Sequence, residues 1–196
     1  LIPGSIETYH DGFSPSAGNC KPFSSGDMIA ECVQVYHSCY GKHFFDNYLQ
    51  AINTNKRMDG RNDKASSLVL WEDENVMLFV PKAQTSQWEL QLMSKPDRQG
   101  RWPGNIIETD TATRRSIDMA LLKAQQALAG RGARMVTSIE YSKRFSAPED
   151  KQPLIYCLLP KIPQSPGAFS ESQHRFINGH YPEDFAAVCR TELKNS

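Results

Sequence analysis

The sequence lacks both a net charge and a strongly basic segment. Its 22 lysine and arginine residues balance 22 aspartate and glutamate residues, and the basic residues are scattered. A neutral chain of this kind provides no field that would attract nucleic acid or an anionic membrane surface. The sequence also lacks any apolar stretch close to the roughly 20 residues that a membrane helix needs. We therefore expect no nucleic-acid partner and no membrane span.

Cysteine is scarce and forms no metal or redox motif. The five cysteines are widely spaced, and no two of them make a C-x-x-C pair: Cys20, Cys32, Cys39, Cys157 and Cys189. This spacing supports neither a zinc ribbon nor a dithiol redox centre. We interpret the cysteines as reduced thiols of a cytoplasmic protein that holds no metal and no cofactor. No secretory signal is visible, and the chain opens at Leu1 rather than at a methionine, which favours sequence upstream of it.

What is present is the pattern of one folded domain with an extension. A chain of 196 residues with 39% hydrophobic and 22% charged residues is typical of a globular protein at the upper end of single-domain size. Residues 1–26 are rich in glycine, serine, proline and asparagine, which predicts an extended arm or linker. Residues 27–196 are predicted to form the domain.

The hydrophobic periodicity of that domain predicts helices and strands in an alternating order. Helices are expected at about 28–38, at 111–129 with Thr109, Asp110 and Thr111 as N-cap candidates, and after Pro182. A short helix or turn is expected at 44–52. Strands are expected at 67–72, 76–80, 87–93, 134–141 and 154–160. In the third strand Trp88, Leu90 and Leu92 alternate with Glu89 and Gln91, which predicts one buried face. This order predicts an α+β fold with helix 111–129 across one face of a mainly antiparallel sheet.

Three segments resemble the galactose-1-phosphate uridylyltransferases and their histidine-triad relatives. Leu70–Lys95 is similar to a strand–turn–strand followed by an aromatic-Glu strand, with Ser94 in place of the family's proline. The string LIYCLLPK, Leu154–Lys161, is similar to the family's HxHxExLPR strand. The segment Gly167–Arg190 is similar to the family's closing segment, with Asn178 and Pro182 in step. The resemblance covers roughly residues 27–193, points to the second of the family's two repeats, and implies a HIT-like sheet with helices packed on it.

The residues that carry the family's chemistry are missing. Histidine-triad catalysis needs a neutral imidazole that attacks a phosphoryl group. Alignment on the Leu-Pro-Lys ending puts Pro153 and Ile155 where the paired histidines stand, and Cys157 where a glutamate is usual. The string HPHGQ, which holds the family's nucleophile, does not occur. We therefore predict no catalytic residue in this chain, and the metal site of the family's second repeat is in doubt for the same reason.

The resemblance does imply a role for the closing segment. It predicts that Phe169 to Asn178 reaches a partner subunit and lines a sugar-phosphate pocket, with Asn178, His174 and Phe169 as substrate-binding residues. The competing interpretation is that Asn178 caps the turn before Pro182. His37 and His43 lack a second ligand pair and are interpreted as surface or capping residues.

Two hypotheses on function stay open. In the first, the chain is a degenerate HIT-like domain of a uridylyltransferase-like nucleotidyltransferase, which contributes fold, homodimer contacts and part of a pocket for a sugar phosphate or nucleotide sugar. In the second, it is a free-standing pseudoenzyme that acts as a binding or scaffolding module.

Overall fold

The structure is a computed structural model that describes residues 25–61, 63–146, 150–161 and 178–195. Its centre is a sheet of five strands in the order β1-β2-β3-β5-β4, and all neighbouring strands are antiparallel. The strands are β1 (Val69–Glu72), β2 (Val76–Phe79), β3 (Leu90–Ser94), β4 (Val136–Tyr141) and β5 (Ile155–Pro160). The α+β fold with a mainly antiparallel sheet is thereby confirmed.

The hairpin between β1 and β2 forms because its turn satisfies its own backbone. The Asp73 carboxylate accepts hydrogen bonds from the backbone N–H groups of Asn75 and Val76 at 2.8 and 2.9 Å. An aspartate that bonds the backbone two residues ahead closes a turn without help from the rest of the fold. Asp73 therefore acts as a residue of the turn.

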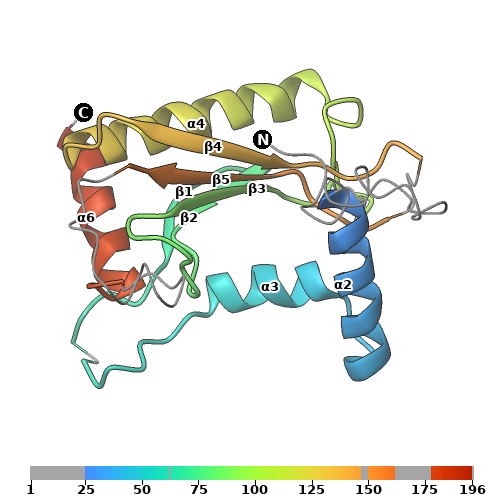
Figure 1. Cartoon of the computed structure of the whole chain (residues 1–196), viewed down its shortest axis with the longest axis horizontal. Coiled ribbons are helices and arrows are strands. Elements are labelled where there is room, and N and C mark those ends of the chain that lie inside the picture. Colours follow the sequence, from blue (N-terminus) through green and yellow to red (C-terminus); the bar gives the residue numbers. More distant parts are fainter. Residues whose placement is uncertain (1–24, 62, 147–149, 162–177, 196) are drawn as a thin grey trace, which may run out of the picture.

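Helices α4 (Thr111–Gly130) and α6 (Pro182–Asn195) cover one face of the sheet (Figure 1). The predicted N-cap is confirmed, since the Asp110 side chain accepts a hydrogen bond from the Thr113 backbone N–H at 2.7 Å. Ala120, Ala124 and Leu128 point from α4 into the larger core, where they are fully buried. Small alanines on this stripe let the helix lie close to the strands.

Helices α2 (Ser25–Tyr40) and α3 (Phe44–Asn53) form a second core on the opposite face (Figure 1). Helix α2 begins at Ser25, inside the segment predicted as an arm; the rest of that prediction falls on residues outside the described ranges. In the second core Phe45 packs on Trp102, with ring centroids 6.2 Å apart. The centre of the sheet is therefore covered on both faces.

Burial on both faces corrects one prediction about the third strand. Glu89 was expected on an open face, yet it is only 1% exposed, and Gln91 is half-buried. Trp88 lies before the strand rather than in it, and its backbone has φ of 62°. The alternation of apolar and polar residues is real, but the polar side faces a buried hydrogen-bond network instead of solvent.

Candidate functional site

The residues that the resemblance aligns with the family's paired histidines are buried or half-buried. Ile155 opens β5 and packs against the second core, while Pro153, just before the strand, is buried. Cys157 is 5% exposed, and its thiol donates a hydrogen bond to Glu89 Oε1 at 3.1 Å. Burial, followed by the nearby Glu89 carboxylate, raises the pKa of the Cys157 thiol far above its ordinary range. The thiol therefore stays protonated and cannot act as a nucleophile.

Glu89 organises the loop between β2 and β3. Its Oε2 accepts hydrogen bonds from the Thr85 backbone N–H at 2.6 Å, from the Thr85 hydroxyl at 2.8 Å and from the Ser86 N–H at 3.3 Å. Its Oε1 accepts from Gln91 Nε2 at 2.8 Å as well as from Cys157. The left-handed backbone at Trp88, the residue before Glu89, is strained. Strain of this kind persists only where the surrounding structure fixes the conformation. Here the buried carboxylate of the next residue supplies that constraint.

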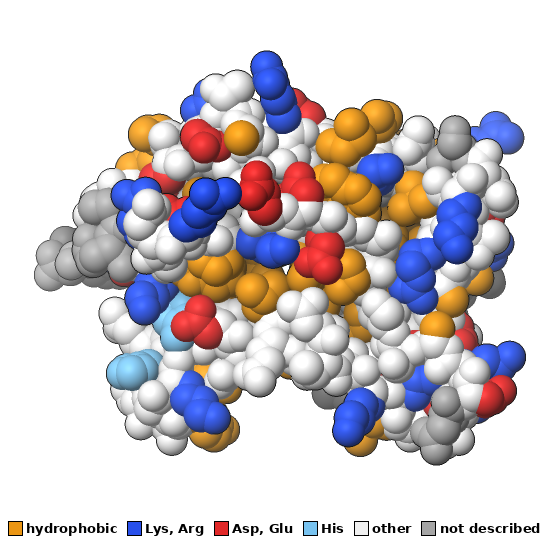
Figure 2. All heavy atoms as spheres, turned by 180° about the vertical axis from the view of Figure 1, so that it is seen from behind, with side chains coloured by type: hydrophobic (Ala, Val, Ile, Leu, Met, Phe, Trp, Pro, Cys, Tyr) orange, Lys and Arg blue, Asp and Glu red, His pale blue; other side chains and the backbone are white. Residues whose placement is uncertain are grey.

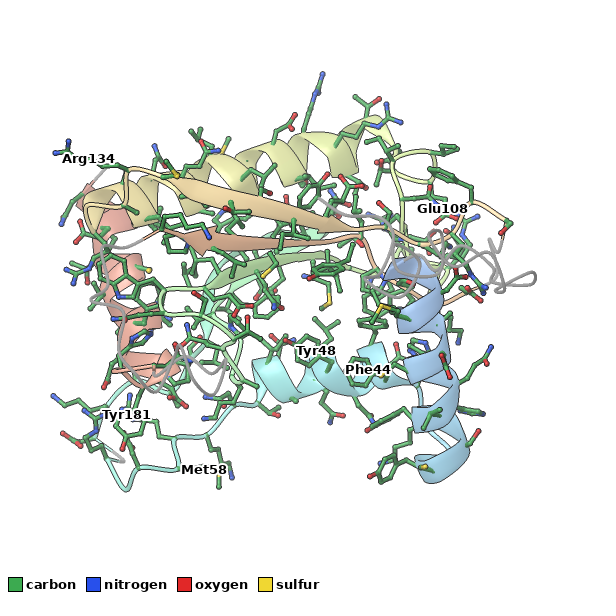
Figure 3. All side chains as sticks on the ribbon, viewed as in Figure 1. Phe44, Tyr48, Met58, Glu108, Arg134 and Tyr181 are labelled. Carbon is green, nitrogen blue, oxygen red and sulfur yellow. The ribbon has the colours of Figure 1, made fainter. Side chains whose placement is uncertain are left out.

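The hydrogen-bond network continues to helix α3. Tyr48, which lies between α3 and the sheet in Figure 3, donates its hydroxyl to Gln91 Oε1 at 3.4 Å. Burial and the neighbouring Glu89 raise the pKa of Tyr48 to about 12, so the phenol remains a donor at neutral pH. Glu89, Gln91, Cys157 and Tyr48 thus form one polar cluster inside the protein.

Asn178 lies against the same loop. Its Nδ2 donates a hydrogen bond to the Gln84 backbone carbonyl at 2.9 Å, and Gln84 Nε2 donates in turn to the Glu89 carbonyl at 3.4 Å. Asn178 Oδ1 is buried and has no hydrogen-bond partner among the described residues. The amide therefore bridges to the loop after β2, and does not close the turn before Pro182 as the competing interpretation required.

The neighbouring aromatic side chains form a short stack. The His180 ring lies 5.2 Å from the Phe185 ring, and Phe185 stacks on Trp88 at 6.2 Å. The Arg131 guanidinium lies over the Trp88 ring, 5.5 Å from its centroid. Burial lowers the pKa of His180, against the opposing effect of Asp184, so its imidazole is neutral at pH 7. His174 and Phe169, the other two predicted binding residues, lie outside the described residues.

A set of ion pairs joins the loop after α3 to the start of α6. Arg57 contacts Asp59 at 2.5 Å and Asp184 at 2.9 Å, and Arg61 bridges the same two carboxylates at 2.6 Å each. Next to them Glu183, 2% exposed, accepts from Lys82 and from Asn55 Nδ2. These contacts fix the first turn of α6, and with it the segment that carries Asn178 and His180.

A separate pocket of about 780 Å³ lies at the N-terminal end of α4. Figure 3 places Glu108, one of its lining residues, at the opposite end of the molecule from Tyr181. Two ion pairs lie within the pocket lining: Lys143 with Glu108 at 2.7 Å and Arg101 with Asp97 at 2.8 Å. We assign this pocket no role in the candidate site.

Among the described residues, the histidines and the charged surface groups form no further candidate site. His43 is the N-cap residue of α3 but makes no side-chain capping bond, so the predicted capping role is not realised. Within the described ranges no group of three or more His, Cys, Asp or Glu side chains could hold a metal ion. On the face seen in Figure 2, basic and acidic side chains are interspersed. No helix in the described part of the chain is long and apolar enough to span a bilayer.

Comparison with known proteins identifies the fold. No family model and no curated protein matches the sequence. Among solved structures, a uridylyltransferase superposes with a TM-score of 0.64 at 12% identity, over 86% of this chain and 50% of that one. An ADP-glucose phosphorylase from Arabidopsis thaliana with bound ADP-glucose gives 0.60 at 16% identity, over 82% and 47%. A galt-like protein from the same plant gives 0.59 at 16% identity, over 82% and 48%.

These similarities confirm that the chain has the uridylyltransferase-like fold that the three segments predicted. The chain spans about half the length of the solved structures it matches. The similarity at 12–16% identity establishes the fold alone.

The sequence indicated Asn178 but missed the network that holds it. Nothing in the closing segment points to the Gln84 carbonyl, because that contact joins residues far apart in the chain. A signal for Glu89 was present in the aromatic-Glu pair of the first resembling segment, but strand alternation placed it on an open face.

Proposed function

We propose that this chain is a degenerate, non-catalytic HIT-like domain that contributes part of a sugar-phosphate or nucleotide-sugar pocket. The observation that carries the proposal is the packing of Pro153, Ile155 and Cys157. At the places that the resemblance aligns with the family's paired histidines and glutamate, this chain has a buried proline, a half-buried isoleucine and a protonated buried thiol. None of these groups can form a nucleotidyl intermediate.

The binding half of the proposal is supported by the surroundings of Asn178. A buried amide oxygen without a partner in the described residues is an acceptor that a ligand hydroxyl would satisfy. The neutral His180 ring and the Arg131–Trp88 stack lie on neighbouring elements, and aromatic faces of this kind suit sugar or nucleobase rings. The solved relative that contains ADP-glucose makes that compound a suitable probe.

The test of the chemistry is an intact-mass measurement after incubation with a uridylyl donor or ADP-glucose. We expect no covalent nucleotidyl adduct and no turnover above background. Restoring histidines by the double substitution Pro153→His and Ile155→His should not produce activity, because the phosphate-binding groups around them are absent too. A uridylylated histidine in the unmodified chain would refute the non-catalytic assignment.

The test of the binding role is calorimetric titration of Asn178→Ala with ADP-glucose or a hexose 1-phosphate. We expect binding to weaken by about 1–3 kcal/mol, the cost of leaving a buried polar partner unsatisfied, with only a small fall in melting temperature. Asn55→Ala is the matched control, since Asn55 bonds Glu183 and the Ser66 carbonyl within the ion-pair region. It should lower the melting temperature and leave the affinity unchanged.

A scaffolding module is the second candidate, and one observation favours it. The one hydrogen bond found for Asn178 among the described residues is internal, to the Gln84 carbonyl. Under this function the unmodified chain binds neither probe, and Asn178→Ala lowers only the melting temperature. That pair of results would remove the pocket and leave the fold assignment intact.

A further inference from the structure

Helix α2 presents a regular apolar seam to solvent. Met28, Cys32, Val35 and Cys39 follow one another at spacings of four, three and four residues, and all four are exposed. Met28 is 52% exposed and Val35 57% exposed, so the feature of interest is their alignment on one side of the helix. The same spacing forms the contact line of paired helices.

The seam points away from the body of its own molecule. On the opposite side of α2, Ala30 is buried, while Ile29 and Val33 pack against the second core. Figure 1 shows α2 at one end of the molecule, with its later turns extending past α3. Among the described residues the seam therefore joins neither core cluster, and a partner helix can approach it.

We propose that α2 pairs in antiparallel orientation with α2 of a second copy of this chain. A spacing of four, three and four reads the same in both directions. A two-fold axis passing between Val33 and Gln34 therefore sets Met28 opposite the partner's Cys39, and Cys32 opposite the partner's Val35. A seam that complements itself is what an isologous interface requires.

The charges along the helix favour this arrangement. Glu31 is exposed in the first half of α2, whereas His37 stands in its last turn and Lys42 is exposed just beyond it. Antiparallel pairing brings the acidic half of one helix toward the basic end of the other, and it also opposes the two helix dipoles. Parallel pairing would instead set the two Glu31 side chains at the same level.

A membrane surface fits the seam less well than a second copy. Helices that lie on membranes carry lysine or arginine beside their apolar face. Helix α2 contains neither residue, since its sequence is SGDMIAECVQVYHSCY. The seam is also a single row of four residues, which is wide enough for contact with one facing helix.

The contact is small, so the association should be weak and dependent on concentration. A helix of 16 residues is about 24 Å long, and one helix pair of that length buries less than the roughly 1,200 Å² of a standard interface. This inference rests on α2 alone and is independent of the ligand-binding proposal.

The first experiment is sedimentation velocity of the intact chain under reducing conditions, over a wide concentration range. We expect a reversible monomer–dimer equilibrium. Val35→Glu should weaken dimerisation at least about tenfold, because it puts a carboxylate into an apolar contact. Gln34→Glu is the matched control, since it adds the same charge to the neighbouring exposed position, off the seam. It should leave the equilibrium unchanged.

Two results would overturn the proposal. One is an unmodified chain that stays monomeric up to its solubility limit. The other is a dimer that Val35→Glu and Gln34→Glu weaken equally, which would place the interface elsewhere. Circular dichroism of both variants establishes that they fold, as expected for substitutions at exposed positions.

The second experiment tests the orientation. Met28→Cys places a thiol opposite the partner's Cys39, and brief oxidation with copper–phenanthroline in air should join these two positions. Non-reducing peptide mapping should then find crosslinks between positions 28 and 39. A map dominated by crosslinks between identical positions would refute the antiparallel arrangement.

Discussion

The carboxylate of Glu89 is held by donors from the loop after β2, from β3 and from β5. Glu89→Gln keeps the shape of the side chain but turns one acceptor oxygen into a donor group that faces other donors. We expect a loss of about 1–3 kcal/mol in the free energy of unfolding, measured by urea denaturation. Glu72→Gln is the control, because Glu72 pairs with Lys95 at 3.2 Å at the surface and should change stability by less than about 0.5 kcal/mol. Equal effects would mean that the Glu89 network contributes nothing specific.

Gly104 is required by close approach of two backbones. A Cβ atom at this position would lie 2.3 Å from the Gln152 carbonyl oxygen and 2.6 Å from Lys143 Cβ. We expect Gly104→Ala to lower the free energy of unfolding by about 1–3 kcal/mol, since neither neighbour is a flexible side-chain end. Gly179→Ala meets no atom within 4 Å and should be nearly neutral. A neutral Gly104→Ala would show that the loop can move aside.

At the scale of elements, α4 depends on the cap at its first turn. Asp110→Ala removes the acceptor for the Thr113 N–H, and we expect a loss of about 1 kcal/mol in the free energy of unfolding. Asp110→Asn preserves that acceptor and should restore most of the loss. If both variants are equally destabilised, the carboxylate acts through its charge rather than through the cap.

The elements were predictable from sequence because their signals are local. The cap at Asp110, the turn at Asp73 and the alanine stripe of α4 each show in a short window. The faces that those elements bury were less predictable. The third strand reads as half-exposed, but α3 comes from elsewhere in the chain to cover it, and so Glu89 is buried. The left-handed backbone at Trp88 has no local signal, because a tertiary network imposes it.

At the scale of the whole molecule, two half-buried histidines couple stability to pH. Burial lowers the pKa of His43 and His180 below the ordinary value of 6.5, although Asp46 and Asp184 oppose the shift. The unfolded chain then binds protons at a higher pH than the folded chain does. The contribution of the two neutral histidines to the free energy of unfolding is therefore fully present above about pH 6.5. It falls as the pH drops toward the pKa values of the folded state.

Chemical denaturation between pH 7 and pH 5 checks this expectation. His43→Gln combined with His180→Gln should flatten the profile over that range. Hydrogen bonds from arginine lower the pKa values of the Asp59 and Asp184 carboxyl groups. These two groups therefore lose their contribution to the free energy of unfolding only in more acid solution. An unchanged slope in the double variant would assign the pH dependence to other groups.

The candidate site was predictable only in part. The departure from the HxHxE pattern was read from the sequence alone, because the resemblance aligns Pro153, Ile155 and Cys157 with that motif. The contact between Asn178 and Gln84 joins two segments that are 94 residues apart, and no pattern in either segment encodes it. The role of Asn178 as a ligand contact stays a prediction.

The sheet has two edges, and Arg190 closes one of them. Its guanidinium donates to the backbone carbonyls of Ser67 and Val69 at 2.9 Å each, beside and at the start of β1. Carbonyls occupied in this way are not available to an added strand, whereas among the described strands β4 pairs with β5 alone. An endless stack of sheets needs two free edges on every molecule. By occupying these two carbonyls, the side chain of one arginine on α6 hinders edge-to-edge growth through β1.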